Sequence, residues 1–180
     1  VMIDTLHQNL SRISAPNFWN EFQLEKGNYI ILTLHRPSNV DEENSLIDLL
    51  KGIDQMVGNK KVIFPIHPRT KAILGEQNLS LKNILLVEPQ GYLNFMYLIK
   101  NSFAVITDSG GISEETTVLG IPCFTLRTTT ARPETIEIGT NHLIGTSIKN
   151  LEKTFSDFLK NGAKKAGIPA CAARHFSAKV

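Results

Sequence analysis

The 180-residue sequence contains only two cysteines, and that scarcity excludes a fold held together by disulfide bonds. Cys123 and Cys171 lie in no CxxC spacing and near no paired histidine, and the sequence has no HExxH motif. Structural zinc and a catalytic metal centre are therefore not expected. We predict a chain that folds around its own hydrophobic core in a reducing compartment.

Long apolar runs are also missing, since no stretch approaches the roughly 20 residues that a membrane helix requires. Residues 1–4 lack the basic and then apolar layout of a secretion signal. We therefore expect a cytoplasmic protein that makes no membrane contact.

Neither sign of charge is in large excess, because 19 Lys and Arg residues stand against 17 Asp and Glu residues, for a net charge of +2. The charge is unevenly spread, with seven basic and two acidic residues between 149 and 180. We interpret this basic end as the solvated face of a closing helix, and we expect no nucleic-acid partner.

What the sequence does contain is an alternation of short apolar runs with amphipathic stretches. This alternation is typical of an α/β fold, in which helices cover both faces of a buried parallel sheet. The predicted strands are Tyr29–Leu34, Val62–Ile66, Ile84–Val87, Phe103–Thr107, Cys123–Leu126 and a short His142–Ile144.

Helices are predicted wherever apolar residues recur at helical spacing between these strands. The predicted helices are residues 3–13, 46–57, Thr70–Gln77, Tyr92–Lys100, Gly111–Leu119 and Ile148–Leu159, with 161–180 as a helix or tail. We expect one domain over residues 1–180. Because it opens in a helix rather than a strand, we also expect it to be part of a longer protein.

Polar residues follow four of the predicted strands directly, where a parallel sheet gathers its ligands. Because the carboxyl ends of parallel strands meet at one edge, the sequence predicts a shared crevice there. The four segments are His35-Arg36-Pro37-Ser38-Asn39, His67-Pro68-Arg69, Glu88-Pro89-Gln90 and Asp108-Ser109-Gly110-Gly111.

The step Ser109-Gly110-Gly111 joins a predicted buried strand to a predicted helix. Free N–H groups and the positive end of the dipole at a helix start attract anions, and glycine lets a phosphate approach the backbone. A diphosphate is a natural occupant. Alternatively, Asp108 or Ser109 only caps the helix and the glycines only make the turn. The sequence motifs for binding a nicotinamide dinucleotide and for a Walker phosphate-binding loop are absent, so neither kind of nucleotide site is expected.

Two further residues could serve a nucleotide at that helix start. Glu115 lies about one helical turn beyond the glycines, where a carboxylate could accept hydrogen bonds from ribose hydroxyls. Arg132 could approach the phosphate from the opposite wall, because a guanidinium fork matches phosphate oxygens. The competing interpretations are a surface carboxylate and a surface ion pair. His35 and His67, each taken alone, read as loop residues or satisfied polar groups.

Taken in chain order, these residues resemble the non-hydrolysing UDP-N-acetylglucosamine 2-epimerase family. The matching segments are Leu32–Asp41, Ile66–Pro68, Glu88–Phe95, Thr107–Glu115, Leu119–Pro122 and Thr130–Glu134, followed by Gly139 and Gly145. The resemblance implies a Rossmann-like domain that forms the carboxy-terminal half of a two-domain, GT-B-like architecture. It also implies a UDP-sugar substrate, no cofactor, a missing amino-terminal domain and a homodimer.

The resemblance further implies roles for individual residues. Those that would contact UDP or the sugar are Arg36, Gln90, Phe95, Ser109, Gly110, Gly111, Glu115 and Arg132, with His35 as the catalytic group. Ser109 and the two glycines would hold the diphosphate and Glu115 the ribose. Gln90 and Phe95 would frame the uracil, while His35 and Arg132 would address phosphate or the departing UDP.

The family reaction removes the proton at carbon 2 of the sugar, expels UDP to leave a glycal-like intermediate, and then adds both back with inverted configuration. The carboxylates for this sugar chemistry lie in the family's amino-terminal domain, so the resemblance implies that the isolated chain is inactive. Departures from the family pattern affect sugar specificity: Ser38 stands in place of Glu, Ser113 in place of a common Gln, and Ala131 at an acidic position. The end from Gly167 also loses a Trp-Asp-Gly-like stretch.

Two other functions stay open at this point. Two-domain glycosyltransferases use a similar nucleotide-sugar domain and a helix start for diphosphate. A regulatory UDP-sugar-binding module without catalysis is the second alternative.

Overall fold

The computed structural model describes residues 2–40, 43–74, 80–163 and 167, and its centre is a six-stranded parallel sheet. In chain order the strands are β1 (Tyr29–Thr33), β2 (Lys61–Pro65), β3 (Ile84–Val87), β4 (Ala104–Thr107), β5 (Cys123–Thr125) and β6 (Asn141–Leu143). All six predicted strands are confirmed, each with bounds within one residue of the prediction. The α/β fold class is confirmed as well.

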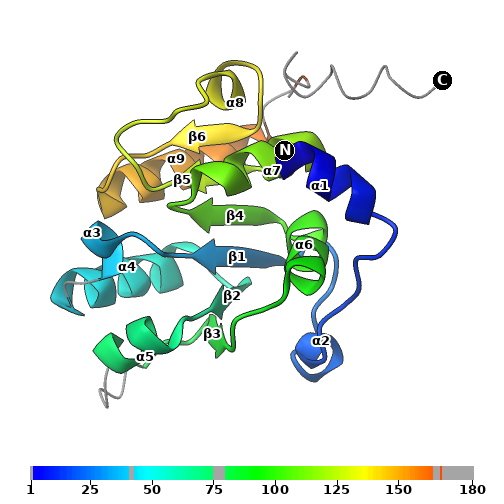
Figure 1. Ribbon diagram of the computed structural model, residues 1–180. Helices are drawn as coiled ribbons and strands as arrows, with labels where there is room; N and C mark the ends of the chain where they lie inside the picture. Colours follow the sequence, from blue (N-terminus) through cyan, green and yellow to red (C-terminus); the bar gives the residue numbers. More distant parts are fainter. Residues whose placement is uncertain (1, 41–42, 75–79, 164–166, 168–180) are drawn as a thin grey trace.

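The strands lie in the order β3-β2-β1-β4-β5-β6 (Figure 1). The chain runs outward from β1 to β3 and then crosses back to place β4 on the other side of β1. Four residue pairs align β1 with β4, from Ile30 beside Ala104 to Thr33 beside Thr107. Connections therefore leave β1 and β4 in opposite directions, which opens a crevice beyond their carboxyl ends.

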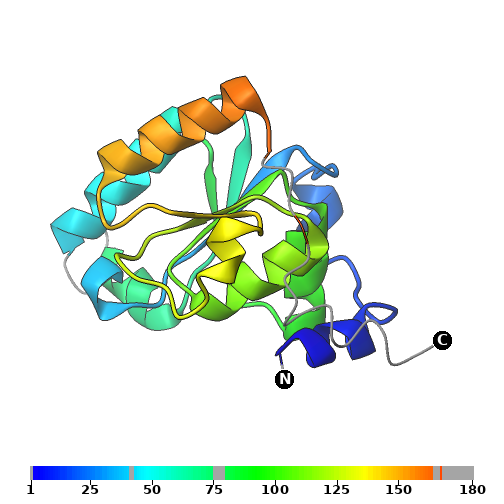
Figure 2. The ribbon, with the colours of Figure 1, turned by 90° about the horizontal axis from the view of Figure 1, so that it is seen from above.

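Helices cover both faces of the sheet (Figure 2). One face carries α4 (Glu43–Met56) and α9 (Ile148–Asn161), and the other carries α1 (Met2–Asn9), α6 (Tyr92–Asn101) and α7 (Gly110–Leu119). Alternation along the strands supplies both layers, because Ile30 packs in the first core cluster and Ile31 in the second. All five residues of β1 are buried, as expected of a central parallel strand.

The remaining helices are short. α5 (Pro68–Leu74) confirms the helix predicted over Thr70–Gln77, and its last predicted residues fall in 75–79, outside the described residues. The sequence did not predict α2 (Phe18–Glu21), α3 (Pro37–Val40) or α8 (Glu134–Glu137). The helix or tail expected over 161–180 lies almost wholly outside the described residues.

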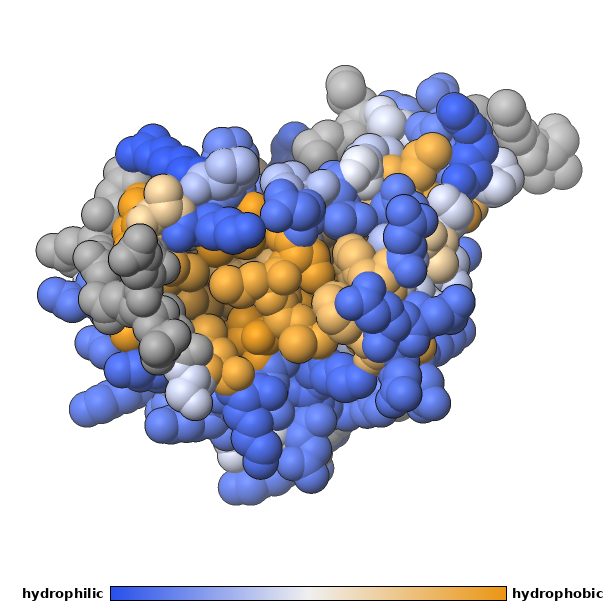
Figure 3. Space-filling model, turned by 90° about the horizontal axis from the view of Figure 1, so that it is seen from below, coloured by the Kyte–Doolittle hydropathy of each residue, from blue (hydrophilic) through white to orange (hydrophobic). Residues whose placement is uncertain are grey.

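Strand β3 forms one edge of the sheet, and Leu86 on it is 42% exposed. Figure 3, which views the molecule from below, shows hydrophobic residues gathered near the middle of that side, with hydrophilic residues around them. In the described ranges, no helix combines the length and the apolarity needed to cross a bilayer.

Candidate functional site

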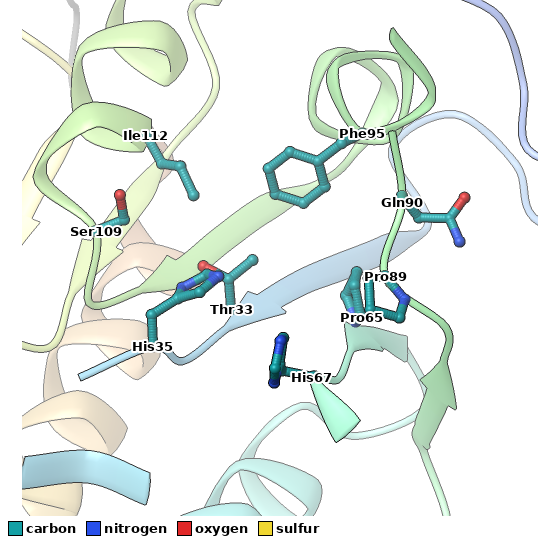
Figure 4. Close-up of a pocket in the computed structure, with 9 residues that line it drawn as sticks. All are labelled: Thr33, His35, Pro65, His67, Pro89, Gln90, Phe95, Ser109 and Ile112. Atoms are coloured by element: carbon teal, nitrogen blue, oxygen red, sulfur yellow. The ribbon is translucent and has the colours of Figure 1, made fainter. Parts of the chain in front are cut away.

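A cavity of about 300 Å³ lies at the carboxyl ends of β1 and β2, between α6 and α7 (Figure 4). Each of the four polar segments predicted to meet at this edge contributes to its wall. The lining residues are Thr33, His35, Pro65, His67, Pro89, Gln90, Phe95, Ser109 and Ile112. The predicted crevice is therefore present, and it brings His35, Gln90, Phe95 and Ser109 together.

Asp108, directly after β4, accepts hydrogen bonds from the segment that follows β1. Both of its carboxylate oxygens accept the backbone N–H of His35 at 3.0 Å, and Oδ2 also accepts the N–H of Arg36 at 2.9 Å. The Asn39 side-chain amide donates to the same Oδ2 at 3.0 Å. Burial raises the pKa of Asp108, but these hydrogen bonds and His35 outweigh it, so the pKa lies below its ordinary value.

The imidazole of His35 stands above this carboxylate. Its Nδ1 lies 3.7 Å from Oδ1 of Asp108, and the His35 side chain is 65% exposed while that of Asp108 is fully buried. The interaction with Asp108 raises the pKa of His35 above its ordinary value, although partial burial opposes the shift. A histidine in this setting carries positive charge at a higher pH than usual.

The start of α7 has no side-chain cap. Ser109 is extended, with φ −90° and ψ 125°, and its hydroxyl makes no capping hydrogen bond. Asp108 directs its oxygens to the loop after β1 instead, so the alternative in which Asp108 or Ser109 caps the helix is wrong. The backbone N–H of Ser109 donates to Thr107 Oγ1 at 3.0 Å, which leaves those of Gly110 and Gly111 for an anion.

Arg127, which the sequence analysis did not single out, lies against the same helix start. A Cβ on Gly110 would come within 2.9 Å of Arg127 Nη1, so the guanidinium lies directly against this glycine. Within the described ranges no carboxylate pairs with Arg127. The available signal was topological: β5 pairs with β4, so the segment that follows β5 lies beside the segment that follows β4.

Glu115 lies one turn along α7 and is only 2% exposed, so the competing interpretation as a surface carboxylate is wrong. The Tyr92 hydroxyl donates to its Oε1 at 3.1 Å. Burial raises the pKa of Glu115 to about 7, with the Tyr92 hydrogen bond opposing and the charge of Glu114 adding to the shift. Glu115 stands behind the cavity wall and does not line it.

Phe95 and Gln90 form the far end of the cavity. Figure 4 shows the Phe95 ring extending from α6 toward Ile112, with the Gln90 carboxamide directed away from His35. Gln90 Nε2 donates to the backbone oxygen of Glu88 at 2.8 Å. An apolar ring beside an amide is a suitable surface for a flat heterocycle.

Gly110 and Gly111 also do not line the cavity, and neither do two predicted arginines. The Arg36 side chain is exposed, and the backbone N–H of Arg36 is what reaches Asp108. Arg132 Nε donates to Glu114 Oε1 at 2.8 Å, which ties the loop after β5 to α7. Among the described residues, no group of three or more His, Cys, Asp or Glu side chains could hold a metal ion.

Comparison with known proteins gives consistent findings. A family model described as UDP-N-acetylglucosamine 2-epimerase matches residues 1–176. The UDP-N-acetylglucosamine 2-epimerase of Methanocaldococcus jannaschii is 43% identical over 164 residues, which cover 84% of this chain and 44% of that protein. The chain thus spans about half the length of the relatives it matches.

Solved structures show the same relationship. The crystal structure of the M. jannaschii UDP-GlcNAc 2-epimerase in complex with UDP-GlcNAc and UDP superposes with a TM-score of 0.76 at 38% identity, covering 97% of this chain and 51% of that one. An E. coli heptosyltransferase with ADP superposes with a TM-score of 0.53 at 10% identity over 74% of this chain and 45% of that one, which shows a shared fold alone.

Proposed function

Since the chain belongs to the UDP-N-acetylglucosamine 2-epimerase family, we propose that it supplies the UDP-binding half of an enzyme that interconverts UDP-GlcNAc and UDP-ManNAc. The observation that carries the proposal is the uncapped start of α7, which opens beside a cavity at the carboxyl ends of the strands. The relative from M. jannaschii has UDP-GlcNAc and UDP bound in its crystal structure.

The diphosphate binds at the first turn of α7, at Ser109, Gly110 and Gly111. Glycine allows the phosphate oxygens close to the backbone N–H groups, and the helix dipole favours their negative charge. Arg127 supplies a guanidinium on the same side, beside Gly110. Arg132, held by Glu114, is a second cation that closure of the site could bring to the phosphate.

The nucleoside lies across the adjoining strand ends. Uracil stacks on Phe95, and its polar edge meets the Gln90 carboxamide. The ribose hydroxyls replace the Tyr92 hydroxyl on Glu115, which is the polar partner of that buried carboxylate. Tyr92 is 36% exposed, so its ring can move aside without disturbing the buried core.

Chemistry follows from how this chain holds the leaving group. A protein base that faces the sugar removes the proton from carbon 2. The bond between carbon 1 and oxygen breaks, and the electron pair of that bond departs with the β-phosphate of UDP. Positive groups at that phosphate, His35 and Arg127, stabilise the charge that develops there. Return of UDP to carbon 1 and of a proton to the opposite face of carbon 2 completes the inversion. The acid and the base that act on the sugar come from the companion amino-terminal domain.

Isothermal titration of UDP into the purified chain tests the proposal. Wild-type protein is expected to bind UDP, and Ser109→Trp is expected to abolish binding because the indole fills the phosphate position. Ser147→Trp is the matched control, because Ser147 also precedes a helix in the same extended conformation, with φ −88° and ψ 123°, away from the cavity. Absence of UDP binding in the wild type, or equal binding in all three proteins, contradicts the proposal.

The two alternative functions predict different products. A glycosyltransferase releases free UDP and a glycosylated acceptor, whereas an epimerase changes the sugar without an acceptor. A regulatory module binds UDP-sugar but never converts it, even when joined to a companion domain. The only support for transfer is the shared fold of the heptosyltransferase, so epimerisation is the function we propose. The homodimer and the cytoplasmic location stay predictions.

A further inference from the structure

Asp108 places a fully buried negative charge directly beneath the mouth of the cavity. Its two oxygens accept hydrogen bonds from the backbone N–H groups of His35 and Arg36 and from the Asn39 side chain. Asp108 lies 73 residues after His35 in the chain. The cation within ion-pair distance of it is the His35 imidazole. A buried carboxylate is costly unless donors and a positive partner surround it, so this arrangement favours a charged His35.

We propose that Asp108 is a positioning residue, an inference that rests on the proposed function. Asp108 fixes the loop after β1 at the cavity, keeps the His35 imidazole charged and directs it toward the β-phosphate of UDP. Asp108 itself touches no ligand in this arrangement. It acts through His35, whose side chain is the one of the pair that is exposed to the cavity.

The geometry assigns separate tasks to the two ring nitrogens of His35. Nδ1 faces the Asp108 carboxylate at 3.7 Å, which leaves Nε2 on the exposed edge of the ring. When the ring is protonated, both nitrogens are donors. Nε2–H then donates to a phosphate oxygen of the departing UDP while the carboxylate balances the charge on the other side.

Among the residues that the structure describes, three ionisable groups lie close to His35. Asp108 lies beneath it after β4, Arg36 follows it on the same loop, and His67 shares the cavity wall after β2. Of these, Asp108 alone is acidic, and its interaction is what raises the pKa of His35. The contribution of His35 to UDP affinity is therefore fullest at low pH and falls as the pH rises through that elevated pKa, which lies above the ordinary 6.5.

Two measurements on the purified chain test this inference. NMR of the imidazole signals follows the titration of His35, and calorimetry follows the UDP dissociation constant against pH. In Asp108→Asn we expect the midpoint of the His35 titration to fall, with the midpoint of UDP binding moving in the same direction. UDP affinity at neutral pH should drop about tenfold, the effect of one lost charge-assisted hydrogen bond. In His35→Gln the His35 midpoint should be absent, and the titrations of UDP itself and of Glu115 should remain.

Asp54→Asn is the matched control. Asp54 on α4 also accepts backbone N–H groups, those of Lys82, Asn83 and Ile84 at 3.0, 2.7 and 3.2 Å, but it lies away from the cavity. The control should leave both midpoints unchanged. If Asp108→Asn weakens UDP binding by the same factor at every pH and changes neither midpoint, Asp108 is only structural and the inference is overturned.

A wild-type His35 that titrates at or below 6.5 overturns the inference as well, and this arm needs no variant to fold. The measurement is made on the free protein, so it is independent of the proposed function. Wild-type protein that fails to bind UDP defeats the proposed function, whereas UDP binding with an ordinary His35 defeats only the role of Asp108.

Discussion

Two adjacent glutamates on α7 occupy opposite environments. Glu114 is partly exposed and pairs with Arg132, whereas Glu115 is buried and meets the Tyr92 hydroxyl. Burial places the pKa of Glu115 at about 7, above the 4.5 expected for an unfolded chain. Between these two values the folded state holds a proton that the unfolded state has lost, so stability decreases as the pH rises from about 4.5 to about 7.

Glu115→Gln should remove this part of the pH dependence, because the amide does not titrate. The penalty for the charged wild-type group above pH 7 is at most roughly 3 kcal/mol, from the separation of the two pKa values. Urea unfolding at pH 5 and pH 8 measures it. The variant should lose less stability than the wild type between these conditions.

Glu152→Gln, on the exposed side of α9, serves as the control and should follow the wild type. Equal pH dependence in the wild type and in Glu115→Gln would show that the Glu115 carboxyl titrates normally in the folded chain.

Individual site residues were predictable only where chain order reveals them. His35, Gln90 and Ser109 follow apolar runs directly, and parallel topology brings strand ends together, so their meeting was correctly predicted. The role of Asp108 was not predicted, because its partners lie about 70 residues away and a short polar side chain before a helix resembles a cap. The packing of Arg127 on Gly110 leaves no local pattern in the sequence either.

At the scale of helices and strands, elements long enough to repeat a pattern were predicted well. Apolar runs such as β1 are buried on both faces, and α9 shows its apolar stripe over 14 residues. The helices α2, α3 and α8 have four residues each, little more than one turn, so no period can appear. Their ends depend on tertiary contacts that a local sequence pattern does not contain.

The approach of α8 to α7 depends on Gly139. A Cβ there would lie 2.4 Å from the backbone oxygen of Thr135 and 2.7 Å from the Thr117 hydroxyl oxygen. Gly139→Ala should therefore destabilise the fold by about 2 kcal/mol or more, because backbone must move. Thermal unfolding measures the loss.

Gly91→Ala is the comparison for this substitution. A Cβ on Gly91 meets nothing within 4 Å, so we expect a loss below about 1 kcal/mol from the changed helix N-cap alone. Similar losses at both positions would mean that the contact between α7 and α8 is looser than described.

At the scale of the whole molecule, the chain spans about half the length of its relatives. Under the proposed function it holds UDP, and a companion domain supplies the groups that act on the sugar. We expect the rigorously purified chain to bind UDP yet leave UDP-GlcNAc unconverted. NMR of the sugar signals over hours measures conversion, with a full-length family member as the positive comparison. Turnover by the chain alone would place the acid and base within these residues.

The loop anchored by Asp108 has a thermodynamic consequence for the entire chain. The residues of the proposed nucleotide site come from connections spread between His35 and Arg127, and a carboxylate directly after β4 holds the loop that follows β1. A fragment that lacks β1 or β4 would not retain the site, because the cavity lies at the ends of both strands. Ligand binding and folding are then linked equilibria, and saturating nucleotide draws the population toward the assembled sheet by mass action.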